Sequence, residues 1–548
     1  MSVAGASPVP RNEHVDVALV GFQDQGNLGM GYLAATLREH GRTVELLEFR
    51  DGPEALVDRV RELDPLVVGF SLIFQYYLPG FRDLAVALRD AGVSSHFTIG
   101  GHYPSLCHDE VLEAMPELDS VVRFEGELTL ADLVSRLTTG DDWREVAGLA
   151  YAADGDIVET EPRTLLRNLD ELPWPDRPQP FEEVLGVTAA PVLASRGCAR
   201  RCSFCSIHTF YRTAPGKVVR VRAPDRIVDE LTHLHEAHDV RIFLFQDDDF
   251  PLWGKAGRRW VDALVTELHE RELVGRAIWK ISCRAEYVEP ELFSMLRDAG
   301  LYLVYMGLES GTDTGLDVLN KQISVATNRA AIETLKSIGV MFEYGFMLFD
   351  PTSTFESIRA NIGFMREIVG DGSAAATFCR MLPYGGTPIR DQLAAEGRLR
   401  GDVVRPDYDF LDLRLNDYHG QLDAAAGSWI HGHGVSHQLN WAWNELEIVG
   451  RLVGELDGDA AYRTGLADLT RRSNEALFAL VEESADDYER SGDSPLLDEW
   501  PNRVTCDAFV RELLEIRNDF VRTNQTELAE AILVRRELTG PVTQPQIF

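Results

Sequence analysis

Short apolar runs alternate with helical patterns over the first 150 residues of the chain. A helical pattern runs from Gly31 to His40, and Gly41 closes it. Alternating strands and helices predict a parallel, doubly wound sheet with helices on both faces. The expected strands are Val15–Val20, Thr43–Phe49, Leu66–Ser71, Phe97–Gly100 and Val121–Phe124.

Small or polar residues gather where these strands end. Ligands of doubly wound sheets bind in the crevice beyond the carboxyl ends of the strands, so these residues are candidates for a binding site. The alternative is a Rossmann-like domain that binds a nucleotide or nothing. The residues concerned are Asn27, Gly29, Ser71, Gly100, Gly101 and Gly126.

A second alternating pattern begins near residue 190. It follows a predicted linker, residues 151–189, in which the stretch Leu172–Pro180 holds four prolines and cannot continue a helix. Six strand-like runs with helical patterns between most of them predict a partial (β/α)6 barrel over residues 190–400. The runs are Pro191–Ser195, Arg241–Gln246, Ala277–Cys283, Leu301–Leu308, Met341–Leu348 and Ala374–Leu382.

Polar residues follow several of these barrel strands. Asp247, Asp248 and Asp249 follow the second strand, Arg284 the third and Glu309 the fourth. A barrel places all strand ends on one face, where its chemistry is found. The alternative for each acid is a helix N-cap. Cys283 and Cys379 lie within apolar runs and are interpreted as buried small hydrophobic residues.

Three cysteines follow the first barrel strand. Cys198, Cys202 and Cys205 form a C-x3-C-x2-C array. Three thiolates can hold three irons of a [4Fe-4S] cluster and leave the fourth iron open for a ligand. The alternative is a Cys3His zinc site completed by His208.

The array resembles the signature of the radical S-adenosylmethionine (SAM) enzymes. The resemblance implies that SAM binds the open iron and that Phe204 lies near its adenine. It further implies that Asp247, Asp248 and Asp249 meet the SAM amino group. Arg284 and Glu309 are implied to approach its carboxylate or ribose.

The N-terminal region resembles the cobalamin-binding domain that precedes many radical SAM barrels. Four stretches carry the resemblance: Leu28–Ala34, Gly69–Ser71, Gly100–His102 and Glu125–Glu127. It implies cobalamin contacts from the strand-end residues above and from Leu28, His102 and Glu127; His102 is equally well explained as a polar loop residue. No D-x-H-x-x-G motif is present, and the nearest stretch, Asp24–Gly26, has no histidine. Cobalamin is therefore expected to bind without a protein imidazole beneath cobalt.

The net charge, the short apolar runs and the cysteine content of the chain argue against a nucleic-acid-binding, membrane-spanning or secreted protein. The 548 residues carry a formal net charge of −35, which opposes binding to nucleic acid. No apolar run approaches the roughly 18 residues of a membrane span. Seven cysteines in a chain of this length predict reduced thiols, and the N-terminus shows no signal segment, so a cytoplasmic location is expected.

The remaining residues, 401–548, have a helical and acidic pattern and are predicted to form a substrate-associated domain. One stretch, Trp429–Trp443, holds His431, His433 and His437 among aromatic residues. Their spacing is irregular for a metal site, so a lid of the substrate pocket or an ordinary packed helix entry is preferred, and a wall or lid of the pocket is the hypothesis to test. A metal site is the alternative.

The two resemblances together imply an α/β enzyme with a [4Fe-4S] cluster, SAM and cobalamin as cofactors. The expected function is transfer of a methyl group to a poorly activated carbon, through a 5′-deoxyadenosyl radical and methylcobalamin. A small natural-product intermediate, for example in antibiotic biosynthesis, is the expected substrate, with a pyrrole-carboxyl group as one candidate. The expected partner is an electron donor such as flavodoxin or ferredoxin. The alternative is a cobalamin-dependent cyclase or ring-rearranging enzyme without methyl transfer.

Overall fold

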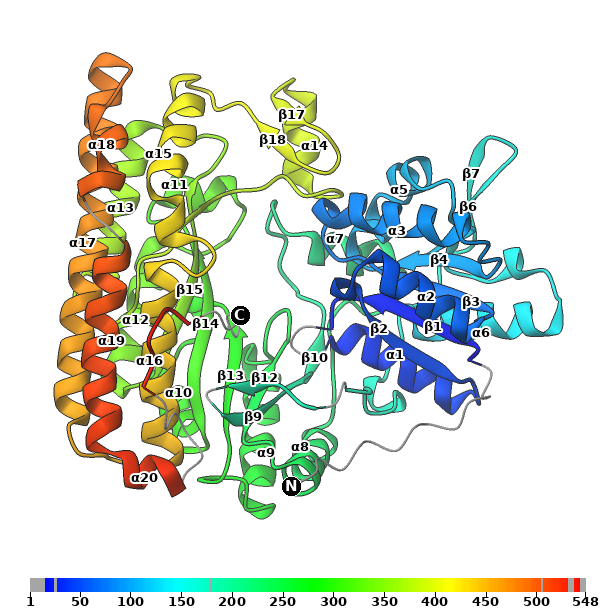
Figure 1. Ribbon diagram of the computed structural model, residues 1–548, viewed down its shortest axis with the longest axis horizontal. Coiled ribbons are helices and arrows are strands. Elements are labelled where there is room, and N and C mark those ends of the chain that lie inside the picture. The colour runs from blue at the N-terminus through cyan, green and yellow to red at the C-terminus, as the bar shows by residue number, and fades with distance from the viewer. Residues whose placement is uncertain are drawn as a thin grey trace.

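The computed structural model describes residues 15–23, 27–177, 180–184, 186–503, 506–530 and 537–542. Two helix-covered sheets stand side by side, and a layer of long helices packs against the outer side of the second sheet (Figure 1). The protein is thus an α/β protein with a Rossmann-like sheet, a half-barrel and a helical C-terminal region. The N-terminal segment Met1–His14 and the stretch Asp24–Gly26, both used above, lie outside the described residues.

The first sheet has the strand order β2-β1-β3-β4-β5-β6-β7, and its first five strands are parallel. Apolar residues of α1 and α6 form the core on one face, and those of α2, α3 and α5 cover the other. The elements are β1 (Val17–Gly21), α1 (Leu28–Glu39), β2 (Val44–Glu48), α2 (Pro53–Leu63), β3 (Val67–Ser71), α3 (Leu78–Asp90), β4 (His96–Gly100), α4 (His102–Leu106), α5 (His108–Ala114), β5 (Ser120–Val122), α6 (Glu127–Thr139), β6 (Leu149–Ala153) and β7 (Asp156–Glu159).

The sheet continues beyond residue 150, into the stretch expected to be a linker. The antiparallel strands β6 and β7 extend its edge next to β5. The pattern analysis missed them because β7 is mostly exposed and its sequence, Asp-Ile-Val-Glu, lacks an apolar face. The proline-rich stretch from Pro173 to Arg177 forms neither helix nor strand, as expected.

The second sheet is a half-barrel with the order β16-β15-β14-β13-β12-β9-β8. All neighbouring pairs from β9 to β16 are parallel. The elements are β8 (Glu183–Val184), β9 (Val187–Val192), β10 (Ser195–Arg196), α7 (Ser206–Thr213), β11 (Arg220–Val221), α8 (Pro224–His238), β12 (Ile242–Phe245), α9 (Gly254–Glu270), β13 (Ile278–Cys283), α10 (Pro290–Asp298), β14 (Leu301–Glu309), α11 (Asp313–Val318), α12 (Val325–Ile338), β15 (Met341–Phe349), α13 (Phe355–Val369), β16 (Cys379–Arg380), α14 (Pro388–Ala395), β17 (Leu399–Gly401) and β18 (Pro406–Tyr408).

Two barrel strands differ from their expected extents. The first, β9, starts at Val187 and includes Pro191, which is tolerated because β8 pairs only as far as Thr188 and leaves this part of β9 on a sheet edge. The sixth, β16, shrinks to Cys379–Arg380 and is itself the opposite edge. Cys283 is buried as expected, whereas the prediction for Cys379 is wrong because the side chain on this edge strand is exposed.

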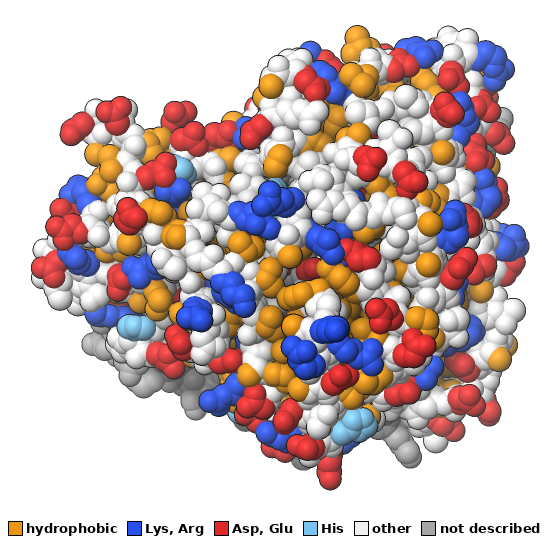
Figure 2. Space-filling view, turned by 180° about the vertical axis from the view of Figure 1, so that it is seen from behind, with side chains coloured by type: hydrophobic (Ala, Val, Ile, Leu, Met, Phe, Trp, Pro, Cys, Tyr) orange, Lys and Arg blue, Asp and Glu red, His pale blue; other side chains and the backbone are white. Residues whose placement is uncertain are grey.

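The C-terminal region is helical, as expected. No helix in the described part of the chain combines the length and apolar character of a membrane span. On the face shown in Figure 2, acidic side chains are widely spread, whereas many Lys and Arg side chains gather between the two lobes. The helices are α15 (Arg414–Ile430), α16 (Val435–Leu452), α17 (Asp459–Ser491), α18 (Pro495–Arg503), α19 (Cys506–Thr523) and α20 (Gln525–Glu530).

The histidine- and tryptophan-rich stretch lies mainly on α15 and α16. Trp429 and Trp443 are buried, and both donate indole hydrogen bonds to α17, to Ser473 and Thr470 respectively. None of its side chains lines the cavity described below. The stretch therefore belongs to the helical core, and the geometry gives the expected lid role no support.

This position predicts a stability effect for Trp429. Its side chain is 1% exposed and packs against Trp500 and Phe509. Trp429→Ala is expected to destabilise the protein by about 3–5 kcal/mol because it leaves a large cavity. His433→Ala, at an exposed position of the same stretch, is the control and should change the midpoint of urea unfolding little. Equal effects of the two variants would contradict the packing described here.

Candidate functional site

The cysteine array lies on the loop between two short paired strands. Cys198 follows β10 closely, and Cys205 immediately precedes α7. Cys202 is buried, and the other two are half-buried. Among the described residues, no three His, Cys, Asp or Glu side chains are grouped tightly enough to hold one metal ion. A cubane cluster does not require such a group, because each of its cysteines binds a different iron.

The three aspartates after β12 meet this loop, each in a different way. Asp247 accepts hydrogen bonds from the Ser195 hydroxyl (2.5 Å) and the Ala194 amide (3.3 Å). Asp248 accepts from the Gly197 amide at 2.9 Å. The first two acids therefore hold the loop before Cys198.

Asp249 is the acid left available to a ligand. Its Oδ2 lies 3.8 Å from the Sγ of Cys198, and its Oδ1 is buried without a hydrogen-bond partner. Burial raises the pKa of Asp249 to about 7. A buried acceptor beside the cysteine loop fits the predicted contact with the amino group of SAM.

Arg284 and Glu309 converge on the same loop. Arg284 donates to Glu286 (2.7 Å), to the Sγ of Cys202 (3.6 Å) and to the carbonyl of Lys321. Glu309, in the left-handed region at φ 66°, forms a buried ion pair of 2.9 Å with Lys321. The sequence analysis missed Lys321, which no motif marks. The structure thus brings Arg284 beside Cys202, and it connects Glu309 to Arg284 through Lys321.

Phe204 precedes the last cysteine, Cys205, in the sequence, and His208 follows it on α7. Phe204 is half-buried and packs against the barrel core. The Nδ1 of His208 lies 3.0 Å from the carbonyl oxygen of Cys205.

Taken together, the three cysteines, Asp249 and Arg284 are suited to hold a cluster and a ligand with an amino and a carboxylate group.

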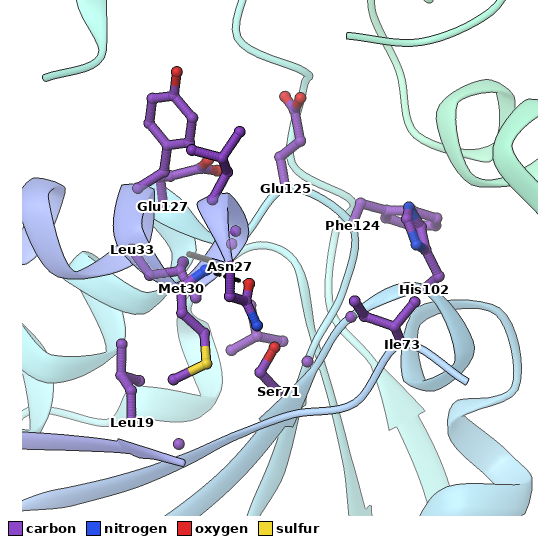
Figure 3. A pocket seen from close by; sticks show the side chains of 18 of the residues that line it. Leu19, Asn27, Met30, Leu33, Ser71, Ile73, His102, Phe124, Glu125 and Glu127 are labelled. Carbon is purple, nitrogen blue, oxygen red and sulfur yellow. Dashed lines mark hydrogen bonds between the residues drawn. The ribbon is translucent and has the colours of Figure 1, made fainter. Parts of the chain in front are cut away.

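A cavity of about 610 Å³ lies between the two sheets (Figure 3). Barrel residues Ser195, Arg196, Gln246 and Asp248 form one wall. Every N-terminal residue predicted to contact cobalamin lies on the other: Asn27, Leu28, Gly29, Ser71, Gly100, Gly101, His102, Gly126 and Glu127.

The cavity reaches deep into the first sheet. It extends to Leu19 and Thr98, in the middle of β1 and β4, and its rim includes the half-exposed rings of Phe74, Tyr76 and Tyr77. A mainly apolar cavity that extends from the middle of the first sheet to the barrel loops fits a large cofactor such as cobalamin. The fit is one of shape and lining, and the individual contacts remain predictions.

Three of the residues on the cavity wall also have structural roles. Gly101 has φ 119°, and a Cβ there would lie 2.0 Å from the carbonyl oxygen of Leu72, so only glycine fits this turn into α4. Asn27 caps α1, because its Oδ1 accepts from the Met30 amide at 3.2 Å. Glu127 is bound to Arg196 at 2.6 Å. Asn27 and Glu127 therefore have structural partners besides any cofactor contact.

His102 lies on the cavity wall with its ring against Phe210, at a centroid distance of 4.6 Å. Burial lowers the pKa of His102 to about 4, so the ring is neutral at physiological pH. No other described histidine lines the cavity.

We expect cobalamin to bind without a histidine below cobalt. Electron paramagnetic resonance of the Co(II) form should then show no nitrogen superhyperfine splitting from the protein. His102→Phe should leave the spectrum unchanged. Splitting that is present in the wild type and lost in this variant would identify His102 as an axial ligand and contradict the expectation.

Comparisons with known proteins agree with this division of the chain. Residues 15–134 match the B12 binding domain family, and residues 192–364 match the radical SAM superfamily. An uncharacterized methyltransferase of Pyrococcus horikoshii is 28% identical over 381 residues, covering 68% of this chain and 79% of that protein.

Two further relatives carry different names. The anaerobic magnesium-protoporphyrin IX monomethyl ester cyclase of Cereibacter sphaeroides is 29% identical over 397 residues, covering 69% of this chain and 62% of the cyclase. The hopanoid C-3 methylase of Methylococcus capsulatus is 29% identical over 426 residues, covering 72% of this chain and 74% of the methylase.

Solved structures share the fold at lower identity. OxsB, a cobalamin-dependent radical SAM enzyme solved with aqua-cobalamin and SAM bound, superposes with a TM-score of 0.68 and 18% identity over 96% of this chain and 82% of OxsB. TsrM, a radical SAM methyltransferase from Kitasatospora setae, gives 0.64 and 17% identity over 84% of this chain and 99% of TsrM. With a B12-binding domain followed by a radical SAM domain, the chain is a cobalamin-dependent radical SAM enzyme whose cofactors are a [4Fe-4S] cluster, SAM and cobalamin.

Proposed function

We propose that the protein is a methyltransferase that acts on a poorly activated carbon of a small natural-product intermediate. The observation that carries the proposal is a cavity shared by the carboxyl ends of the first sheet and of the barrel strands β9 and β12. When bound, the cluster and SAM supply a radical that removes a hydrogen atom, and cobalamin supplies the methyl group. These groups must share one water-poor space with the substrate.

The chain's own residues would hold and orient these groups. Asp249, Arg284 and Glu309 surround the cysteine loop and would fix SAM on the barrel side. The aromatic residues Tyr32 and Tyr211 line the cavity, and their rings pack against Arg196 and Arg220 respectively. Relatives named as methyltransferases or methylases support methyl transfer, and a pyrrole-carboxyl group remains one candidate acceptor.

The experiment is an anaerobic assay of the reconstituted protein with SAM that carries a labelled methyl group. Candidate acceptors, among them pyrrole-carboxyl compounds, are incubated with an electron donor such as flavodoxin or ferredoxin. The expected product contains the labelled methyl group. A product that forms with consumption of SAM but without the label would overturn methyl transfer.

A cyclase or ring-rearranging enzyme is the second candidate. It is favoured by the similarity to magnesium-protoporphyrin IX monomethyl ester cyclases, which covers 62% to 69% of this chain. The same assay separates the two, because a cyclase product has no added methyl mass. A cytoplasmic location and the absence of nucleic-acid partners stay predictions.

A further inference from the structure

Four charged side chains join the B12-binding domain to the loop that carries the cysteines. Glu125 lies between β5 and α6, Glu127 is the first residue of α6, and Arg196 and Arg220 lie on β10 and β11. Arg196 contacts Glu127 at 2.6 Å and Glu125 at 3.1 Å. Arg220 contacts the other oxygen of Glu125 at 2.7 Å and also donates to the carbonyl of Leu166. We call these four residues the interdomain ionic network.

The arrangement depends on the acids of the first domain. Arg196 and Arg220 are directly opposite each other in the β10–β11 pair, where like charges destabilise a ribbon. Glu125 forms an ion pair with both arginines, through Oε1 with Arg196 and through Oε2 with Arg220. The barrel ribbon that precedes Cys198 is therefore completed by the neighbouring domain.

The interdomain ionic network is buried, which makes it strong and insensitive to salt. The side chain of Arg220 is 1% exposed and that of Arg196 is 10% exposed. Burial raises the pKa of Glu125, but the two arginines outweigh it and leave that pKa below its ordinary value. Removing one member leaves an uncompensated buried charge.

The same residues reach both cofactor sites. Glu125, Glu127 and Arg196 line the interdomain cavity. Arg196 is also two residues from Cys198, and Gly197 between them is locked by its hydrogen bond to Asp248. Gly197 has φ 85°, and a Cβ there would lie 2.1 Å from the carbonyl oxygen of Val218, so only glycine fits this short connection.

We propose that the interdomain ionic network couples the two cofactor sites, with Arg196 as the positioning residue. A ligand in the cavity packs against the network and fixes Glu125 and Glu127. These acids hold Arg196, and Arg196 holds the loop in the geometry that retains the cluster. Coupling of this kind is reciprocal, so the cluster also tightens cobalamin binding by the same factor. The inference is independent of whether the enzyme transfers a methyl group.

The test measures release of iron to a chelator from protein with a reconstituted cluster, under anaerobic conditions. Hydroxocobalamin is expected to slow iron release by about tenfold in the wild type, within the usual range of coupling between sites. The dissociation constant for hydroxocobalamin should rise by a similar factor when the cluster is absent. In Arg220→Gln, at a network position that does not line the cavity, both cofactors should still bind, but each factor should fall toward one.

A matched control uses the other ion pair between the domains. Glu110 on α5 and Arg390 on α14 are 2.7 Å apart, and neither side chain contacts the cysteine loop. Glu110→Gln should keep the tenfold protection. Arg196→Lys, which retains the charge but cannot bridge two carboxylates, serves if Arg220→Gln does not fold. Absence of protection in the wild type, or equal protection in wild type and network variants, would overturn the proposal.

Discussion

Replacing Cys198, Cys202 and Cys205 together by alanine is expected to abolish the iron–sulfur cluster and all cleavage of SAM. The three thiols lie on one loop, whose preceding residues donate hydrogen bonds to Asp247 and Asp248, and they are the cysteines available to a cluster there. Iron and sulfide analysis of anaerobically reconstituted protein, together with the visible spectrum, gives the measurement. The barrel itself should remain folded.

The control for this experiment is Cys506→Ala. Cys506 begins α19 in the helical C-terminal region, and its removal should change neither iron content nor SAM cleavage. Retention of roughly four irons per chain in the triple variant would disprove the assignment. Cobalamin binding by the triple variant should persist with reduced affinity if the proposed coupling holds.

Ser71→Trp is expected to block cobalamin binding while the cluster is retained. Ser71 ends β3 on the cavity wall, and an indole there would occupy the space between the sheet and the barrel loops. We expect the affinity for hydroxocobalamin to fall by at least a hundredfold because the ligand and the indole cannot share the space. Binding is followed by the change in the absorbance of cobalamin.

Ser94→Trp is the matched control. Ser94 lies at the amino-terminal edge of the same sheet, on a shallow polar hollow away from the cavity, and is exposed. The Ser94→Trp variant should bind cobalamin with the affinity of the wild type. If Ser71→Trp also bound it normally, cobalamin would have to occupy a different surface, and the assignment of the nine wall residues would fail.

Much of the architecture was predictable from the sequence because local signals and tertiary packing agree. The parallel strands β1 to β5 and the barrel strands β12 to β15 are apolar runs, and all lie where expected. Predictions failed where a strand lies on an edge and burial is weak. The strand β7 carries no buried face that a pattern could reveal, and the short β16 lies at the edge of its sheet.

The sequence by itself determined the two domain types, the three cysteines and the residues at the strand ends, because each depends on spacing within a short segment. Tertiary structure alone decided which of these residues are free to act. It left Asp249 with a buried free acceptor but engaged Asp247 and Asp248 in the loop. It also joined Glu125 to Arg196 across 71 residues. Such pairings depend on how two domains meet, and no periodicity within either segment records that contact.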